Sequence, residues 1–290
     1  MSEYIIITDA CCDITNEMAE ALGVVVLPLS INMGDKSYRI YPDGREITVS
    51  DYYKELRNGA MPTTNAVSVG EFMDSMELFL KEGRDVLLLP FSSGLSTTYN
   101  SSVIAAEELR DKYPDRKIYT VDTFCVSMGL GLLIWYIVQM QRNGKTIEEA
   151  RDWAENNKLK LCHWFTVSDL NHLKRGGRIS AATALVGTML GIKPVLHVDN
   201  DGHLINMFKA RGRPASLAAL VSQMERLIIA PETQTIFICH SDCMEDAEWL
   251  KNKIIERLKV KEVHIGDIDP VIGAHTGADT VAVFFMGTER

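Results

Sequence analysis

The sequence predicts an α/β protein of two domains, and three observations lead to this prediction. The chain has 290 residues, which is enough for two ordinary domains. Short apolar runs alternate with helical patterns in the first half. A polar, charged helical segment at 146–160 separates this half from a second set of strands and helices. We therefore expect domains at 1–155 and 156–275, with residues near 275–290 as a candidate completion of the first domain.

The first half contains apolar runs that are nearly continuous, as in strands buried on both faces. They predict strands at 4–8, 24–27, 85–89 and 117–121, and helical patterns are found at 69–82 and 96–113. Buried strands joined by helical crossovers are typical of a parallel sheet with helices on both faces. The apolar stretch at 126–140 is too short to span a bilayer and predicts a buried helix.

The second half has its own pattern of strands and helices. Strands are predicted at 161–167, 193–198, 203–208 and 235–239, and helices at 214–229 and 244–258. The residues Asp199-Asn-Asp-Gly202 suit the turn of a hairpin between the second and third of these strands.

Composition excludes several classes of function. The net charge of -9 and the pI near 5.3 argue against nucleic acid as a partner. The six cysteines form no CxxC pair, which argues against a zinc site, and reduced thiols suit a cytoplasmic protein. Met1 runs almost directly into the first predicted strand, so we expect no targeting leader.

A hydroxyl-rich stretch, FSSGLSTTYNS at 91–101, lies where a predicted strand gives way to a helix. A catalytic serine would need the G-x-S-x-G turn, and Gly94-Leu-Ser96-Thr-Thr98 lacks the second glycine. A phosphate cradle is weakly indicated, because Arg175-Gly-Gly-Arg-Ile-Ser180 lacks the GK[ST] ending. A helix N-terminus with serine hydroxyls binds an anion without a cation, so an anion seat fits better.

Two other stretches supply groups for such a seat. Met61-Pro-Thr-Thr-Asn65 brings hydroxyls close before a helix, and Val271 to Gly277 places His275 in a predicted loop between glycines. The alternative for His275 is an ordinary solvated histidine. A metal site is disfavoured there, because no second ligand stands at the required spacing. Together the three stretches predict a seat for one carboxylate.

Several stretches together resemble the DegV family of fatty-acid-binding proteins, which carry acyl chains for a bacterial fatty acid kinase. The matching stretches lie at 7–14, 62–72, 92–102, 121–131, 173–180, 187–204 and 272–279. The resemblance implies a two-domain DegV-like fold, with a Rossmann-like parallel sheet in the N-terminal domain and a smaller α/β C-terminal domain. It also implies a long-chain fatty acid in a tunnel between them.

The resemblance assigns roles to residues of this chain. The family's carboxylate-binding groups fall on Thr64, Ser93, Ser96 and His275. We expect five residues beside this seat, as neighbouring side chains or backbone: Asp9, Asn65, Gly94, Gly273 and Thr276. The family's basic loops fall on Arg178 and on Arg211 or Arg213, which would engage the catalytic subunit of the kinase.

On this interpretation the chain is not an enzyme. It binds a long-chain fatty acid and presents the carboxylate to the kinase for acyl-phosphate formation, with no cofactor and no metal. We expect no stable membrane span, which leaves room for transient membrane contact. Two alternatives remain open: a Ser/His acyl-ester hydrolase and a stand-alone lipid-sensing module.

Overall fold

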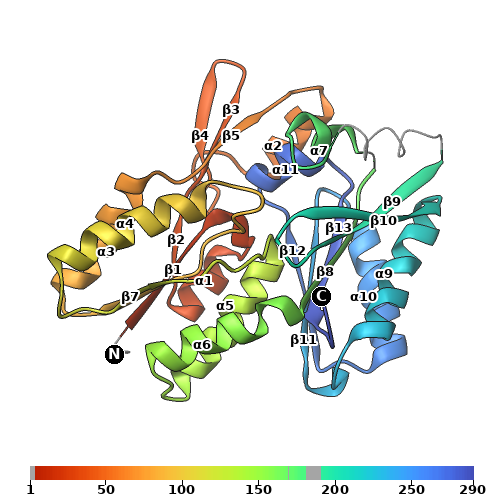
Figure 1. Ribbon diagram of the computed structural model, residues 1–290. Helices are drawn as coiled ribbons and strands as arrows, with labels where there is room; N and C mark the ends of the chain where they lie inside the picture. The colour runs from red at the N-terminus through yellow and green to blue at the C-terminus, as the bar shows by residue number, and fades with distance from the viewer. Residues whose placement is uncertain (1–3, 169, 181–190) are drawn as a thin grey trace.

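Two β-sheets with their helices lie side by side, and helix α5 runs between them (Figure 1). The structure, a computed structural model, describes residues 4–168, 170–180 and 191–290, so part of the stretch at 187–204 lies outside it. A parallel sheet in the first half and a mixed sheet in the second confirm the α/β class predicted from the sequence.

Sheet A is the parallel sheet of the first half. Its strands are β1 (Tyr4–Asp9), β2 (Val25–Leu27), β6 (Asp85–Leu88) and β7 (Ile118–Thr120). Their order is β2-β1-β6-β7, and each neighbouring pair is parallel. All six residues of β1 are buried, because helices cover both faces of the sheet. The four strands predicted for this half are therefore confirmed.

The helices of the first half are α1 (Asn16–Leu22), α2 (Val49–Arg57), α3 (Val69–Lys81), α4 (Thr98–Lys112), α5 (Met128–Arg142) and α6 (Ile147–Asn157), with short 3₁₀ turns η1 (Ala10–Cys12) and η2 (Lys158–Lys160). Helix α3 starts with a capping box, in which Ser68 and Glu71 satisfy each other's backbone N–H groups. The buried helix expected at 126–140 is α5, and the polar helix expected at 146–160 is α6 followed by η2.

A small antiparallel sheet, sheet B, projects from the first half at the top of Figure 1. Its strands are β3 (Ser30–Met33), β4 (Lys36–Arg39) and β5 (Thr63–Asn65), in the order β4-β3-β5. Strand β5 pairs Thr64 with Ile31. Strands β3 and β4 were not predicted from the sequence, because they are short and largely polar.

Sheet C belongs to the second half. Its strands are β8 (Leu161–Thr166), β9 (Ile192–Val198), β10 (Leu204–Arg211), β11 (Thr235–His240), β12 (Glu262–Asp267) and β13 (Val281–Met286), in the order β10-β9-β8-β13-β11-β12. Strand β13 lies between β8 and β11, although residues 275–290 were a candidate completion of the first domain. Its apolar side chains are buried, so it completes the core of sheet C.

The other helices that the structure describes are α7 (Asn171–Arg175), α9 (Arg213–Leu227), α10 (Met244–Leu258) and α11 (Pro270–Thr276), with the 3₁₀ turn η3 (Pro231–Thr233). The prediction of a loop around His275 was wrong, because this segment is helix α11. Asp269 caps its start by accepting a hydrogen bond from the backbone N–H of Ile272, and Pro270 occupies the first turn, where it loses no helical hydrogen bond.

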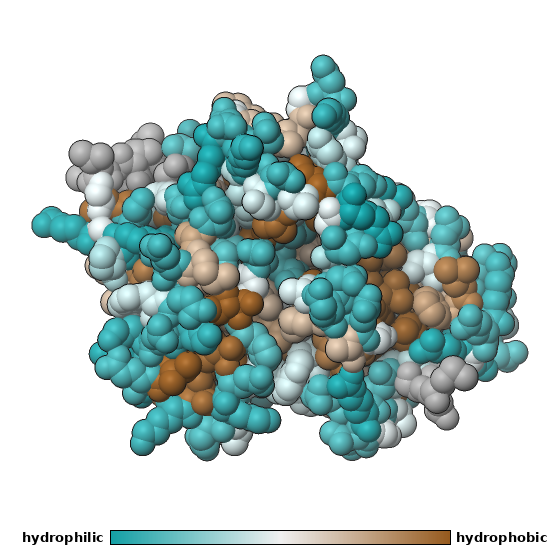
Figure 2. Space-filling view, turned by 180° about the vertical axis from the view of Figure 1, so that it is seen from behind, coloured by the Kyte–Doolittle hydropathy of each residue, from teal (hydrophilic) through white to brown (hydrophobic). Residues whose placement is uncertain are grey.

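The surface is mainly hydrophilic, and apolar residues gather in a few separate patches on the face in Figure 2. Among the described residues, no helix has the length and apolar character needed to cross a bilayer.

Candidate functional site

A cavity of about 400 Å³ lies between the carboxyl ends of sheet A and one face of sheet C. Ligand sites of open α/β sheets are typically found at such strand ends, and this volume is typical of a small-molecule site. The residues that line it are Cys11, Leu29, Thr64, Ala66, Phe91, Ser93, Leu95, Ser96, Thr97, Val126, Ser127, His163, Phe165, Leu173, Arg178, Leu204, Ile268, Val271, Ile272, His275, Thr276, Thr280, Ala282 and Phe284.

Sheet C supplies a largely apolar floor. His163 and Phe165 of β8 face the cavity, and they pair with Phe284 and Ala282 of β13 respectively. Side chains two residues apart share one face of a strand, so these four lie together. His163 is buried and accepts a hydrogen bond from the backbone N–H of Val126 at 3.3 Å. Burial lowers the pKa of His163 well below its usual value, so the floor carries no charge there.

Thr64 and His275 meet at a polar part of the cavity wall. Thr64 Oγ1 lies 3.0 Å from His275 Nε2, although the two residues are 211 positions apart. Strand β5 turns Thr64 toward the cavity, and α11 brings His275 to it. Gly176 packs against the imidazole, where an added Cβ would come within 2.0 Å of His275 Nδ1. The close packing of α7 on His275 therefore requires glycine at this position.

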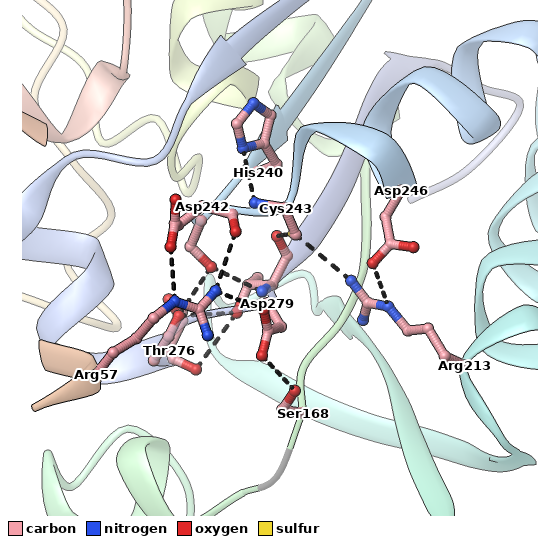
Figure 3. A network of polar contacts seen from close by, with 12 residues as sticks. Arg57, Ser168, Arg213, His240, Asp242, Cys243, Asp246, Thr276 and Asp279 are labelled. Atoms are coloured by element: carbon pink, nitrogen blue, oxygen red, sulfur yellow. Dashed lines mark hydrogen bonds and ion pairs between the residues drawn. The ribbon is translucent and has the colours of Figure 1, made fainter. Parts of the chain in front are cut away.

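Helix α2 holds α11 at both of its ends. Tyr53 donates its hydroxyl to the carbonyl of Ile268, just before α11, at 2.9 Å. Arg57 binds Asp279, just after α11, at 2.7 Å, and also Asp242 at 2.6 Å (Figure 3). The position of His275 thus depends on contacts between the first and the second half of the chain.

His275 is neutral near pH 7. Burial lowers its pKa to about 4, and the positive charges of Arg178 and Arg175 add to this shift. A neutral imidazole and a hydroxyl form a polar but uncharged pair, which can donate hydrogen bonds to an anion without forming an ion pair.

We expect the His275 imidazole to remain neutral as the pH falls to about 4. Between this folded pKa of about 4 and the ordinary histidine pKa, the unfolded chain binds a proton at this group and the folded protein does not. The free energy of unfolding is therefore unaffected by His275 above that range and decreases as the pH falls through it. A ¹⁵N NMR titration of the ring measures the pKa directly. A midpoint near 6.5, the ordinary value for histidine, would contradict this assignment.

The hydroxyl-rich stretch reaches the cavity through the loop between β6 and α4. Ser93 is exposed at this loop, and Ser96 is half-buried. Asp9 supports the loop from β1: its buried carboxylate accepts the backbone N–H of Phe91 at 2.8 Å. Burial raises the pKa of Asp9 to about 6. All four predicted carboxylate-binding residues line the cavity. Asp9 does not line it, but its hydrogen bond to Phe91 holds the loop that carries Ser93 and Ser96.

The other predicted neighbours divide into one lining residue and three that lie outside the cavity wall. Thr276 lines the cavity beside His275. Asn65 is exposed and reaches Ser30, because neighbouring residues of a strand point to opposite faces. Gly94 packs against carbonyls of the 199–202 turn, and Gly273 packs against Tyr53 of α2. Both glycines permit close packing, which is a structural role.

The three predicted docking arginines have different surroundings. Arg178 lines the cavity, and its guanidinium donates two hydrogen bonds to the carbonyl of Leu95, at 3.0 and 2.9 Å. Arg211 is exposed at the end of β10. Arg213 pairs with Asp246 at 2.8 Å, with 19% of its side chain exposed (Figure 3). Arg211 is therefore the most accessible of the three.

Sequence reasoning did not identify much of the cavity wall. Ser127, His163, Phe165 and Phe284 line it, but their sequence context is that of ordinary core residues. His163 and Phe165 lie two residues apart and therefore share one face of β8, which is the face that lines the cavity. Both faces of β8 are buried, so no alternation of apolar and polar residues distinguishes the cavity face in the sequence. Within the described ranges, no three His, Cys, Asp or Glu side chains converge in a way that could hold a metal ion.

The fold and the cavity define a two-domain α/β protein with a largely apolar internal site, whose polar residues include Thr64, Ser93, Ser96 and His275. The chain belongs to the DegV family, whose model, described as "Uncharacterised protein, DegV family", matches residues 4–288. A DegV domain-containing protein of Clostridium perfringens is 47% identical over 290 residues, which cover 100% of this chain and 99% of that protein.

Two solved structures share both the fold and the length of the chain. A DegV family protein of Thermus thermophilus, described by its fatty acid binding, has 28% identity and a TM-score of 0.89, with 99% of this chain and 100% of that chain covered. A stearic acid-binding protein of Eubacterium ventriosum has 25% identity and a TM-score of 0.85, with 97% and 98% covered.

Proposed function

We propose that the protein binds a long-chain fatty acid in the cavity, with its carboxylate at Thr64, Ser93, Ser96 and His275. The observation that supports this most directly is the pairing of Thr64 with a neutral His275 on the wall of an otherwise largely apolar cavity. Relatives of the same fold and length bind fatty acids, which agrees with this assignment.

The two parts of the ligand require different surroundings. Each CH₂ group removed from water contributes about 0.8 kcal/mol, so a chain of about sixteen carbons supplies roughly 10 kcal/mol before the costs of binding. Phe91, Phe165 and Phe284 provide apolar surface for the chain. Uncharged donors hold the carboxylate without a tight ion pair and leave an oxygen available for reaction.

The protein then presents this carboxylate to a fatty acid kinase, which forms the acyl phosphate while the acid stays bound. Arg211 is exposed, and a cation at that position would complement an acidic partner. Arg178 lies at the cavity itself, where its charge would offset that of a transferred phosphoryl group. On this proposal the protein acts in the cytoplasm as a substrate-presenting subunit without a nucleophile of its own.

The contacts of Ser96 and His275 support binding over ester hydrolysis. Ser96 Oγ lies 2.9 Å from Thr98 Oγ1, and His275 Nε2 is engaged by Thr64. A serine hydrolase instead places its serine on the histidine that accepts its proton.

Native mass spectrometry of the purified protein, followed by lipid extraction, tests the proposal. We expect a bound fatty acid with a stoichiometry of one, and no hydrolysis of a p-nitrophenyl acyl ester by the protein alone. Addition of a fatty acid kinase and ATP should convert the bound acid to its acyl phosphate. Ester turnover that depends on Ser93 or Ser96 would overturn the proposal in favour of the hydrolase.

A further inference from the structure

Asp13 connects two elements that contribute polar groups to the cavity. It follows η1, and its Oδ1 accepts a hydrogen bond from the backbone N–H of Asp269 at 3.1 Å. Its Oδ2 accepts a hydrogen bond from the hydroxyl of Ser127. Asp269 immediately precedes α11, which carries His275, and Ser127 immediately precedes α5 and lines the cavity. One buried carboxylate therefore joins the starts of both helices.

The backbone is strained on two sides of this junction. Asp13 has φ of 53° and Ser127 has φ of 58°, and both values lie in the left-handed region that favours glycine. Residues other than glycine persist there when surrounding contacts hold them, and such strain is concentrated at functional sites. The hydrogen bond between Ser127 and Asp13 is one contact that holds both residues.

The groups around the junction are acids, thiols and phenols. Those that interact electrostatically with Asp13 or Asp269 come from β1, η1, α2, β11 and the β12–α11 segment: Asp9, Cys11, Cys12, Tyr52, Tyr53, Cys239 and Asp267. Burial, and then the nearby charge of Asp269, raise the pKa of Asp13 well above its usual value. Burial raises the pKa of Asp269 to about 7.

A proton on the pair has a direct structural consequence. Asp13 and Asp269 are 6% and 9% exposed, so water screens their mutual repulsion poorly when both are ionised. With one proton on the pair, Asp269 keeps its cap on Ile272 and Asp13 keeps its bond to the backbone of Asp269. Loss of that proton places two negative charges at the start of α11.

We propose that Asp13 is a positioning residue for fatty acid binding, which holds α11 and therefore His275 against the cavity while the Asp13–Asp269 pair retains a proton. The inference rests on the proposed function and adds a proton-linked control of the same site. Fatty acid affinity then decreases as the pH rises and the pair loses its proton.

The range from pH 7 to 9 isolates this effect. The ligand carboxylate is ionised throughout, since ordinary carboxyl groups titrate near 4. His275, with a pKa of about 4, is neutral throughout. Burial raises the pKa values of Cys11 and Cys239 well above 9.0, and that of Tyr53 well above 10.0. A change in affinity over this range therefore reports on the acidic pair.

The test is the dissociation constant of stearic acid, measured by isothermal titration calorimetry on the lipid-stripped full chain at pH 7, 8 and 9. We expect the wild-type dissociation constant to increase about threefold or more between the lowest and the highest of these pH values. Full linkage of binding to one proton would increase it at most tenfold per pH unit. Asp13→Asn retains an acceptor for Asp269 N–H, so this variant should bind with little dependence on pH.

The matched control is Glu262→Gln. Glu262 lies at the start of β12, 52% of its side chain is exposed, and it pairs with His264 at 3.2 Å. This variant should keep the wild-type dependence on pH. Asp269→Asn, which retains an acceptor for Ile272 N–H, is the second variant and should also bind with little dependence on pH.

The outcomes separate the inference from the proposed function. A wild-type protein that binds no stearic acid at any pH refutes the proposed function. A wild-type protein that binds with constant affinity from pH 7 to 9 refutes the inference alone, and this measurement requires no substitution. The inference also fails if the folded Asp13→Asn or Asp269→Asn protein shows the full wild-type change.

Discussion

Replacing Thr64 with valine should weaken the binding of a long-chain fatty acid about tenfold. Valine has nearly the shape of threonine, so the substitution removes the hydroxyl and leaves the packing of β5 largely intact. His275 Nε2 then loses its partner at 3.0 Å, and the carboxylate loses one donor. A lost hydrogen bond to a charged group costs about 1.5 kcal/mol or more, which corresponds to roughly a tenfold change in affinity.

The adjacent residue offers a matched control. Thr63 belongs to the same strand but is exposed and does not line the cavity. Thr63→Val should therefore leave the dissociation constant within about twofold of the wild type. Equal affinities of Thr64→Val and the wild type, measured by calorimetry with stearic acid, would remove Thr64 from the proposed seat.

Replacing Arg290 with alanine should lower the free energy of unfolding by about 3 kcal/mol. The Arg290 side chain is buried and donates hydrogen bonds to the carbonyls of four residues: Phe124 at 2.7 Å, Lys158 at 2.7 Å, Leu161 at 3.1 Å and Asp199 at 3.1 Å. It also contacts Cys125 Sγ at 3.5 Å. It thereby joins the loop before α5, the η2 turn, β8 and the 199–202 turn. Alanine would remove all of these buried hydrogen bonds at once.

Denaturant unfolding measures this loss, with Arg257→Ala as the control. Arg257 pairs with Glu225 at 3.4 Å on the surface, and 48% of its side chain is exposed. Exposed pairs of this kind contribute little, so this variant should change stability by no more than about 0.5 kcal/mol. If both variants lose the same stability, the buried contacts of Arg290 are not the cause of its effect.

Several features of the site could be predicted from sequence because they depend on local patterns. Serines and threonines between a predicted strand and a predicted helix identified Ser93 and Ser96, and motif positions identified Thr64 and His275. All four line the cavity. Asn65 was expected beside these residues but does not line the cavity, since adjacent residues of a strand point to opposite faces.

The sequence by itself determined the α/β class, the four strands of sheet A and four of the polar residues that line the cavity, Thr64, Ser93, Ser96 and His275. Apolar runs and capping residues act over a few positions, so their pattern is visible along the chain. Only the tertiary structure decided that β13 lies in sheet C, that α2 holds both ends of α11, and that Asp13 meets Asp269. These contacts join residues up to 256 positions apart, and their energies depend on burial and approach in space, which no local pattern records.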